Sequence, residues 1–201
     1  MPLGANKAAI MGVAGVSTGD VVLHSSQDAD EDSVISFTSG IDSTYGEYIF
    51  KFYNIHPSNT SGPEFQFQVN ASGESGYNEA ITSTAFYAYI QEDDGGTPAL
   101  TYNDGMDQDN DDVAFQTIIQ NIGADADESG AGELHLFNPA STTYAKHFYS
   151  RSDVVTHETG PVNYQFHTGG YINTTAAITN VQFKLNAGNI DTGTIKMWGV
   201  K

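Results

Sequence analysis

The chain has 201 residues, with 25 Asp and Glu against seven Lys and Arg, and a formal net charge of −18. So few basic residues argue against a nucleic-acid binder, which must neutralise phosphates, and against binding to an anionic membrane surface. Cys is absent, which excludes disulfides and thiolate metal sites, while 11 Tyr, 11 Phe and 21 Gly are typical of a strand-and-turn protein.

Residues 1–32 differ from the rest and are predicted to form an extended N-terminal arm. The stretch up to residue 16 is small and apolar without an aromatic residue, and an acidic patch follows at residues 28–32. Such a segment cannot form a core of its own, so it either adds to its own sheet or lies along a neighbouring subunit; we favour the neighbour. The expected contact residues of this partner-binding arm are Ile10, Met11, Val13 and Val16.

From Ser33 onward, apolar and polar residues alternate with a period of two, which predicts β-strands. Residues 111–122 could be misread as a helix, but their β-branched and aromatic residues favour a strand. Gly, Pro, Asn and Asp in the connecting segments predict turns. The predicted strands cover residues 34–37, 48–55, 65–69, 80–90, 113–121, 133–137, 144–150, 164–172, 178–185 and 194–200.

This series of short strands predicts the fold class. About eight to ten strands separated by turns are typical of an all-β protein made of two packed sheets. No alternation of strands and helices appears that would indicate a parallel sheet. We therefore expect a single antiparallel β-sandwich over residues 33–201, jelly-roll-like in topology, preceded by the arm of residues 1–32.

Acidic loops are the first candidates for a metal site. Asp107, Asp109 and Asp111 place oxygen ligands at alternating positions, which could hold calcium. The loop departs from the EF-hand pattern, because Asp112 stands where glycine is needed and Ile118 where the bidentate glutamate is needed. A solvated acidic loop is therefore favoured, and we expect no metal and no cofactor.

No motif in the sequence indicates catalysis. There is no Gly-x-Ser-x-Gly elbow, no cysteine nucleophile and no phosphate-binding glycine loop. The six His residues form no close pair with metal-ligand spacing. We therefore expect a protein that is not an enzyme.

Aromatic residues on the predicted strand 80–90 are candidate binding residues. Tyr87 and Tyr89 alternate with Phe86 and Ala88, so one of these pairs is expected to face outward. Outward aromatics on a sandwich can stack on sugar rings or anchor a subunit interface, and we favour the interface.

Several phrases of the sequence, taken together, resemble virion proteins of marine tailed phages (cyanophage- or pelagiphage-like). They lie at residues 41–45 (Ile-Asp-Ser-Thr-Tyr), 48–57, 132–139, 170–175 and 188–200, so that the resemblance covers most of the chain after Ser33. The resemblance implies a virion structural protein of jelly-roll type and brings no catalytic residues with it.

The leading hypothesis is a capsid decoration (cement) protein on the outer head surface, made in the host cytoplasm. It would be a homotrimer whose arm binds the major capsid protein or neighbouring virion proteins, and its acidic surface suits a position away from packaged DNA. The alternative is a tail or fibre component that binds a host receptor glycan. A secreted carbohydrate-active domain is the least favoured hypothesis, and neither nucleic acid nor a membrane is an expected partner.

Overall fold

A computed structural model describes residues 20–92, 96–109, 113–156 and 162–201. The four arm residues predicted to contact a partner, at positions 10, 11, 13 and 16, lie outside these ranges. The described part contains one short 3₁₀ helix, η1 (Asp104–Met106), and twelve strands. The strands are β1 (Val21–Asp32), β2 (Ile35–Phe37), β3 (Glu47–Pro57), β4 (Phe65–Ala71), β5 (Ile81–Gln91), β6 (Ala99–Tyr102), β7 (Gln116–Ile119), β8 (Gly130–Phe137), β9 (Lys146–Val155), β10 (Val162–Ile172), β11 (Ile178–Leu185) and β12 (Ile190–Val200).

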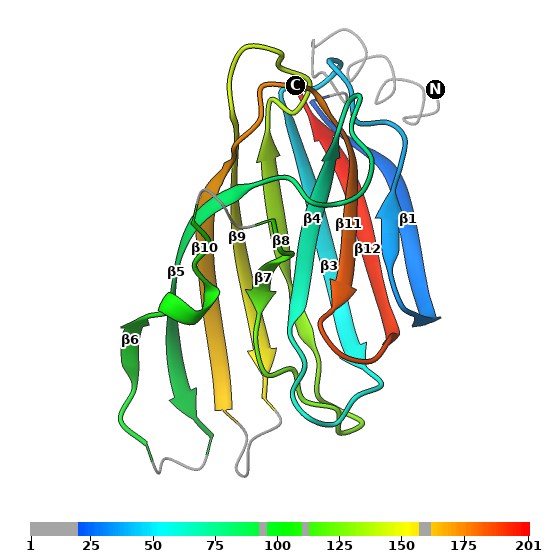
Figure 1. The fold of residues 1–201 in the computed structure, drawn as a ribbon. Coiled ribbons are helices and arrows are strands. Elements are labelled where there is room, and N and C mark those ends of the chain that lie inside the picture. Colours follow the sequence, from blue (N-terminus) through cyan, green and yellow to red (C-terminus); the bar gives the residue numbers. More distant parts are fainter. Residues whose placement is uncertain (1–19, 93–95, 110–112, 157–161) are drawn as a thin grey trace, which may run out of the picture.

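These strands form two antiparallel sheets that pack face to face as a jelly-roll-like β-sandwich (Figure 1). The large sheet has eight strands in the order β1-β12-β3-β8-β9-β10-β5-β6, and the small sheet has four in the order β2-β11-β4-β7. The predicted fold class, an all-β antiparallel sandwich, is thus confirmed. Within the described ranges, no helix is long and apolar enough to span a membrane.

The core between the sheets is built largely from phenylalanine rings. Phe183 of β11 lies at its centre, with ring centroids 5.5 Å from Phe50 and 5.6 Å from Phe65. Phe50 and Phe52 alternate along β3 and are both fully buried, because every second residue of this strand faces the small sheet. The clear alternation in the sequence arises from this contact, so the strands that line the core are the ones that the sequence predicts.

Residues 21–32, which the sequence assigns to the arm, form strand β1 at the edge of the large sheet. β1 pairs with β12 in a register that runs from Val21–Val200 to Asp32–Ile190. Ala29 faces the core, whereas Asp28 and Asp30 point to solvent. This part of the expected arm therefore belongs to the sandwich, and its acidic residues cover an edge strand that would otherwise be open to pairing with another chain.

Three buried glutamine side chains hold the segments around η1 against the small sheet. The Gln68 amide donates to the backbone oxygens of Glu79 and Ala114, at 3.0 and 2.9 Å. Gln116 donates to the backbone oxygen of Met106, and Gln108 donates to that of Phe115. Because buried backbone carbonyls must be paired, these amides substitute for the strand partners that the loops lack.

Candidate functional site

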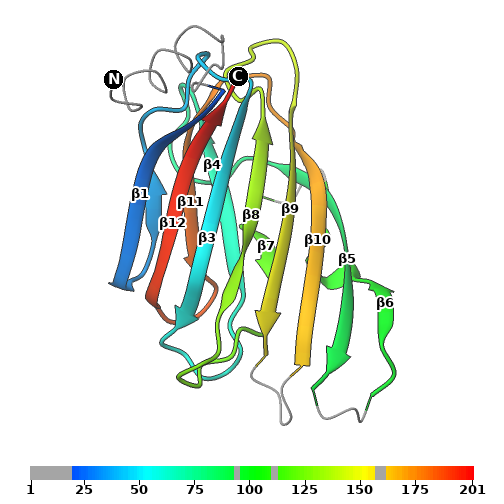
Figure 2. The same ribbon diagram turned by 180° about the vertical axis from the view of Figure 1, so that it is seen from behind.

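The outer face of the large sheet, which points away from the small sheet, is not covered by any other described element. Figure 2 shows β1, β12, β3, β8, β9, β10 and β5 side by side across this face, with the small sheet behind them. Residues that are directly paired on neighbouring antiparallel strands point to the same side of a sheet. The strand register therefore determines which side chains form rows across the outer face.

One row forms an apolar patch at the end of the sheet where β1 begins and β12 ends. The register aligns Leu23 with Trp198, Trp198 with Ile49, Ile49 with His135, and His135 with Tyr149. Leu23 keeps 45% of its surface exposed, and Tyr149 is also exposed. We call this row, Leu23, Trp198, Ile49, His135 and Tyr149, the apolar patch. Clustered apolar side chains on an uncovered sheet face are typical of a protein-binding surface.

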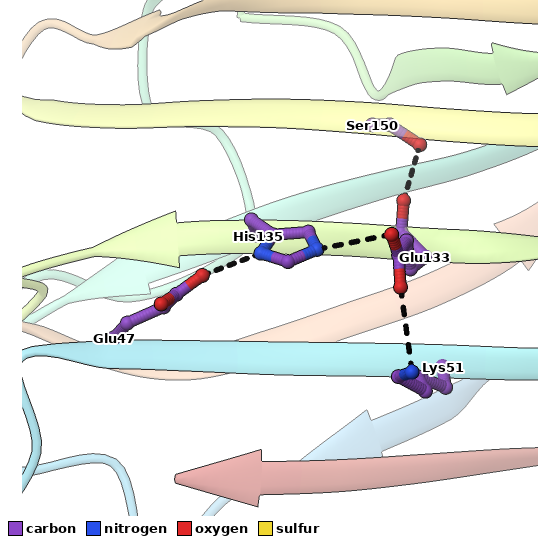
Figure 3. Close-up of polar contacts among 5 residues, drawn as sticks. All are labelled: Glu47, Lys51, Glu133, His135 and Ser150. Carbon is purple, nitrogen blue, oxygen red and sulfur yellow. Dashed lines mark hydrogen bonds and ion pairs between the residues drawn. The ribbon is translucent and has the colours of Figure 1, made fainter. Parts of the chain in front are cut away.

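His135 joins this patch to charged residues of the same face (Figure 3). Its Nδ1 contacts the carboxylate of Glu47, and its Nε2 lies 3.4 Å from the carboxylate of Glu133. The other Glu133 oxygen lies 3.5 Å from the ammonium group of Lys51, and the imidazole stacks on Tyr149 with centroids 4.3 Å apart. Two carboxylates and an aromatic ring therefore surround the His135 side chain at the border between the apolar patch and the charged residues.

The next row along the strands carries the basic residues of the face. It contains Lys196, Lys51 and Arg151, which are three of the chain's seven Lys and Arg residues. The Lys196 ammonium lies 5.6 Å from the ring centre of Tyr53. Arg151 is exposed and forms no ion pair with any described residue. Glu133 lies in the same row, between Lys51 and Arg151, so the row carries three cations and one carboxylate on a chain of net charge −18.

His167 and Phe86 extend this row onto β10 and β5. Their rings stack with centroids 4.9 Å apart and an interplanar angle of 8°. Burial lowers the pKa of His167, and the positive charge of Arg151 lowers it further. The lowered pKa favours the neutral imidazole, so that of these two neighbouring side chains Arg151 carries the positive charge.

A shallow groove crosses the strands beside the basic row. Lys51, Tyr53, Glu133, Arg151, Asp153 and Gln165 surround it, and Ala131 lies at its base. A second depression continues from Asp153 and Gln165 past Ala88 and Asn163. The groove exists because small residues on β8 and β5 lie in the same row as long side chains on β3, β9 and β10.

Tyr87 and Tyr89, the aromatics singled out in the sequence, do not belong to the outer face. Both are half-buried, and Tyr87 packs against the core, with its ring centre 5.2 Å from that of Tyr164. Their side chains point in the same direction as that of Ala85, which lies in the core. The aromatic residue of this strand that faces outward is Phe86, which is 44% exposed.

The candidate calcium loop contains one carboxylate with an evident structural role. Asp107 accepts the backbone N–H of Ala85 at 2.8 Å and the hydroxyl of Tyr102, and so fastens η1 to β5 and β6. Asp111 lies outside the described residues. Across the described part of the chain, no three His, Asp or Glu side chains are grouped closely enough to hold a metal ion.

The sequence alone does not reveal the groove, because its residues come from strands whose register is not encoded in the hydropathy pattern. One sequence feature could have indicated the outer face. Residues 48–53 are apolar or aromatic on both sides of the strand except at Lys51, which indicates that both faces of this strand make contacts.

No family model matches the chain, and no curated protein or solved structure is significantly similar to it.

Proposed function

We propose that the chain is a non-enzymatic structural protein of a tailed-phage virion, a decoration protein that attaches to the major capsid protein on the outer head surface. The observation that carries this proposal is the apolar patch on an uncovered sheet face. The depressions on that face are open to solvent, unlike the enclosed sites in which enzymes exclude water. The virion setting in this proposal rests on the resemblance of the sequence to marine phage proteins.

The place where the described chain begins supports attachment through this end of the sheet. The backbone N–H of Lys201 donates to the carbonyl of Asp20 at 3.0 Å, so the described chain begins and ends at the same place. Leu23 and Trp198, the first pair of the apolar patch, lie three residues from that point. The 19 preceding residues could reach about 60 Å if fully extended, which is enough to contact more than one capsid subunit.

Binding of the purified protein to capsids that lack it tests this mechanism. We expect Leu23→Glu, and separately deletion of residues 1–19, each to weaken binding by about tenfold or more, because a charge or a truncation removes apolar contacts from the interface. Both variants should still fold, since Leu23 is exposed and β1 begins after the deletion.

Leu100→Glu is the matched control, because Leu100 is 72% exposed on β6, at the far edge of the same sheet. This variant should bind like the unaltered chain. Wild-type binding by both Leu23→Glu and the deletion variant would exclude the proposed attachment surface. The expected homotrimer stays a separate prediction, which analytical ultracentrifugation of the purified chain checks.

A second candidate function is that of a tail or fibre component that binds a host glycan. The groove beside the basic row favours it, because it combines an exposed tyrosine with charged and amide side chains. The number of copies per virion separates this candidate from decoration, since a fibre is present in far fewer copies than the shell protein.

A further inference from the structure

We propose that the groove across β3, β8, β9 and β10 binds a sugar that carries a carboxylate group, such as a uronic acid residue of a polysaccharide. This inference does not depend on whether the protein lies on the head or the tail. It is based on four features of the groove: a guanidinium with no ion pair among the described residues, an aromatic ring, neighbouring amide and carboxylate groups, and a base of small side chains.

Arg151 supplies the charge selectivity. It borders the groove, is exposed, and forms no ion pair with a described residue, whereas Lys51 beside it is paired with Glu133 at 3.5 Å. A guanidinium binds a carboxylate through two parallel hydrogen bonds. The chain as a whole repels anions, because its net charge is −18. An anionic ligand would therefore bind only beside a local cation such as Arg151.

Tyr53 supplies an apolar surface at the β3 end of the groove. Its side chain is 41% exposed, and it lies within an irregular part of β3 where the register shifts against both β8 and β12. The next residue, Asn54, has a positive φ of 51°, which marks the bulge. Bulges change the direction of side chains at binding sites, and a tyrosine ring can pack against the C–H groups of a sugar.

The β9 and β10 side of the groove supplies hydrogen-bond donors and acceptors for hydroxyl groups. The Asp153 carboxylate accepts the Asn163 amide at 2.7 Å, and Gln165 lies beside them. The carboxylate keeps further acceptor capacity, and each amide has both donors and an acceptor. Ala131 and Ala88 leave room above the sheet between these groups.

The location of the groove, over strands in the middle of the sheet, favours a sugar over an acidic peptide. An extended peptide usually binds a sheet by pairing with the backbone of a free edge. Here β3, β8, β9 and β10 all have strand partners on both sides, so their backbone groups are already paired within the sheet. Recognition must therefore come from side chains alone, and the ring, guanidinium and amides suit a carboxylated sugar ring.

Titration of the full chain with a galacturonic acid trisaccharide and with the neutral galactose trisaccharide tests the inference. NMR chemical shifts or calorimetry would report the affinity. We expect the acidic sugar to bind and the neutral one to bind at least about tenfold more weakly, because the guanidinium–carboxylate pair is absent from the neutral complex. Arg151→Gln and Tyr53→Ala should each weaken binding of the acidic sugar by a similar factor.

Lys184→Gln is the control, because it removes the same charge from the small sheet, where the ammonium lies over the Phe115 ring. This variant should bind the acidic sugar with unchanged affinity. Equal affinity for the two sugars, no binding of either, or wild-type affinity in Arg151→Gln would each overturn the inference. Tighter binding of an oligoglutamate peptide than of the acidic sugar would overturn it in favour of an acidic protein partner.

Discussion

The buried side chain of Tyr48 stabilises the turn between β2 and β3. Its ring is fully buried, and its hydroxyl accepts the backbone N–H of Asp42 at 2.9 Å and donates to oxygens of the same residue. Burial raises the pKa of this hydroxyl, so the neutral form is maintained in the fold. The segment between β2 and β3 is held against the core by this contact.

Tyr48→Phe should therefore lower the free energy of unfolding by about 1–2 kcal/mol, because the Asp42 N–H loses its buried acceptor. Urea denaturation measures the change. Tyr144→Phe is the control, since Tyr144 is mostly exposed, and it should leave stability unchanged. A Tyr48→Phe variant as stable as the control would show that the hydroxyl does not hold the turn.

The lowered pKa of His167 makes the stability of the fold depend on pH. Its pKa is lowered in the fold by burial and by Arg151. As the pH falls below about 6.5, the unfolded chain takes up a proton at this residue before the folded chain does. The unfolded state then binds more protons, so the free energy of unfolding decreases as the pH falls through this window.

The decrease between pH 7 and pH 5 should be smaller in His167→Gln than in the unaltered chain. Arg151→Gln should raise the pKa of His167, which an NMR titration of the imidazole measures directly. An unshifted pKa in Arg151→Gln would show that the guanidinium does not act on this ring, and would separate His167 from the basic row.

At the level of secondary structure elements, Gly132 determines how closely β8 packs against its neighbours β3 and β9. A Cβ at this position of β8 would lie 2.4 Å from the backbone oxygen of Arg151 and 2.8 Å from the Phe52 ring. Backbone atoms of a central strand cannot move without disturbing the neighbouring pairs. Gly132→Ala should therefore cost about 1–3 kcal/mol of unfolding free energy, as overpacked substitutions do.

Gly46→Ala is the matched control, because a Cβ there has no neighbouring atom within 4 Å and the backbone does not have a positive φ. Thermal or urea unfolding of both variants provides the comparison. Equal stability of the two variants would mean that the sheet yields at Gly132 more easily than its contacts suggest.

The strands that line the core could be predicted from the sequence, and two others could not. β3 and β4 alternate because their inner residues pack against phenylalanine rings. β1 does not show this pattern clearly, since it lies at an edge and carries serine and aspartate residues. β6 has only four residues, two of which, Leu100 and Tyr102, are apolar side chains exposed to solvent. The hydropathy pattern reflects which side chains are buried, so edge strands with few buried side chains cannot be recognised from it.

The groove could not be predicted for a different reason. Tyr53 lies about a hundred positions before Arg151 and Asp153 in the sequence, and it meets them only through the β3–β8–β9 register. Residue type alone singled out Tyr87 and Tyr89, because their alternation shows that one pair faces out but not which pair. Ala85 is buried in the core, which shows that Tyr87 and Tyr89 face inward. The burial of Ala85 depends on the packing of the whole fold.

At the scale of the whole molecule, the outer face is divided into two surfaces of different chemistry. The apolar patch lies at the end of the sheet where the described chain begins and ends, and the basic row and groove lie farther along the strands. The two surfaces are neighbouring rows of the same strands, and His135 of the apolar patch contacts Glu133 of the basic row. A decoration protein built this way would attach by one part of the sheet and present the other part to the surroundings.

The number of copies of this protein per virion tests the central proposal most directly. Quantitative mass spectrometry of purified virions would measure it against the major capsid protein. Attachment of the apolar patch to the shell protein predicts a ratio near parity, because each attachment site of a closed symmetric shell is repeated across the shell. A ratio of only a few hundredths would contradict decoration of the head and place the protein on the tail or at a vertex.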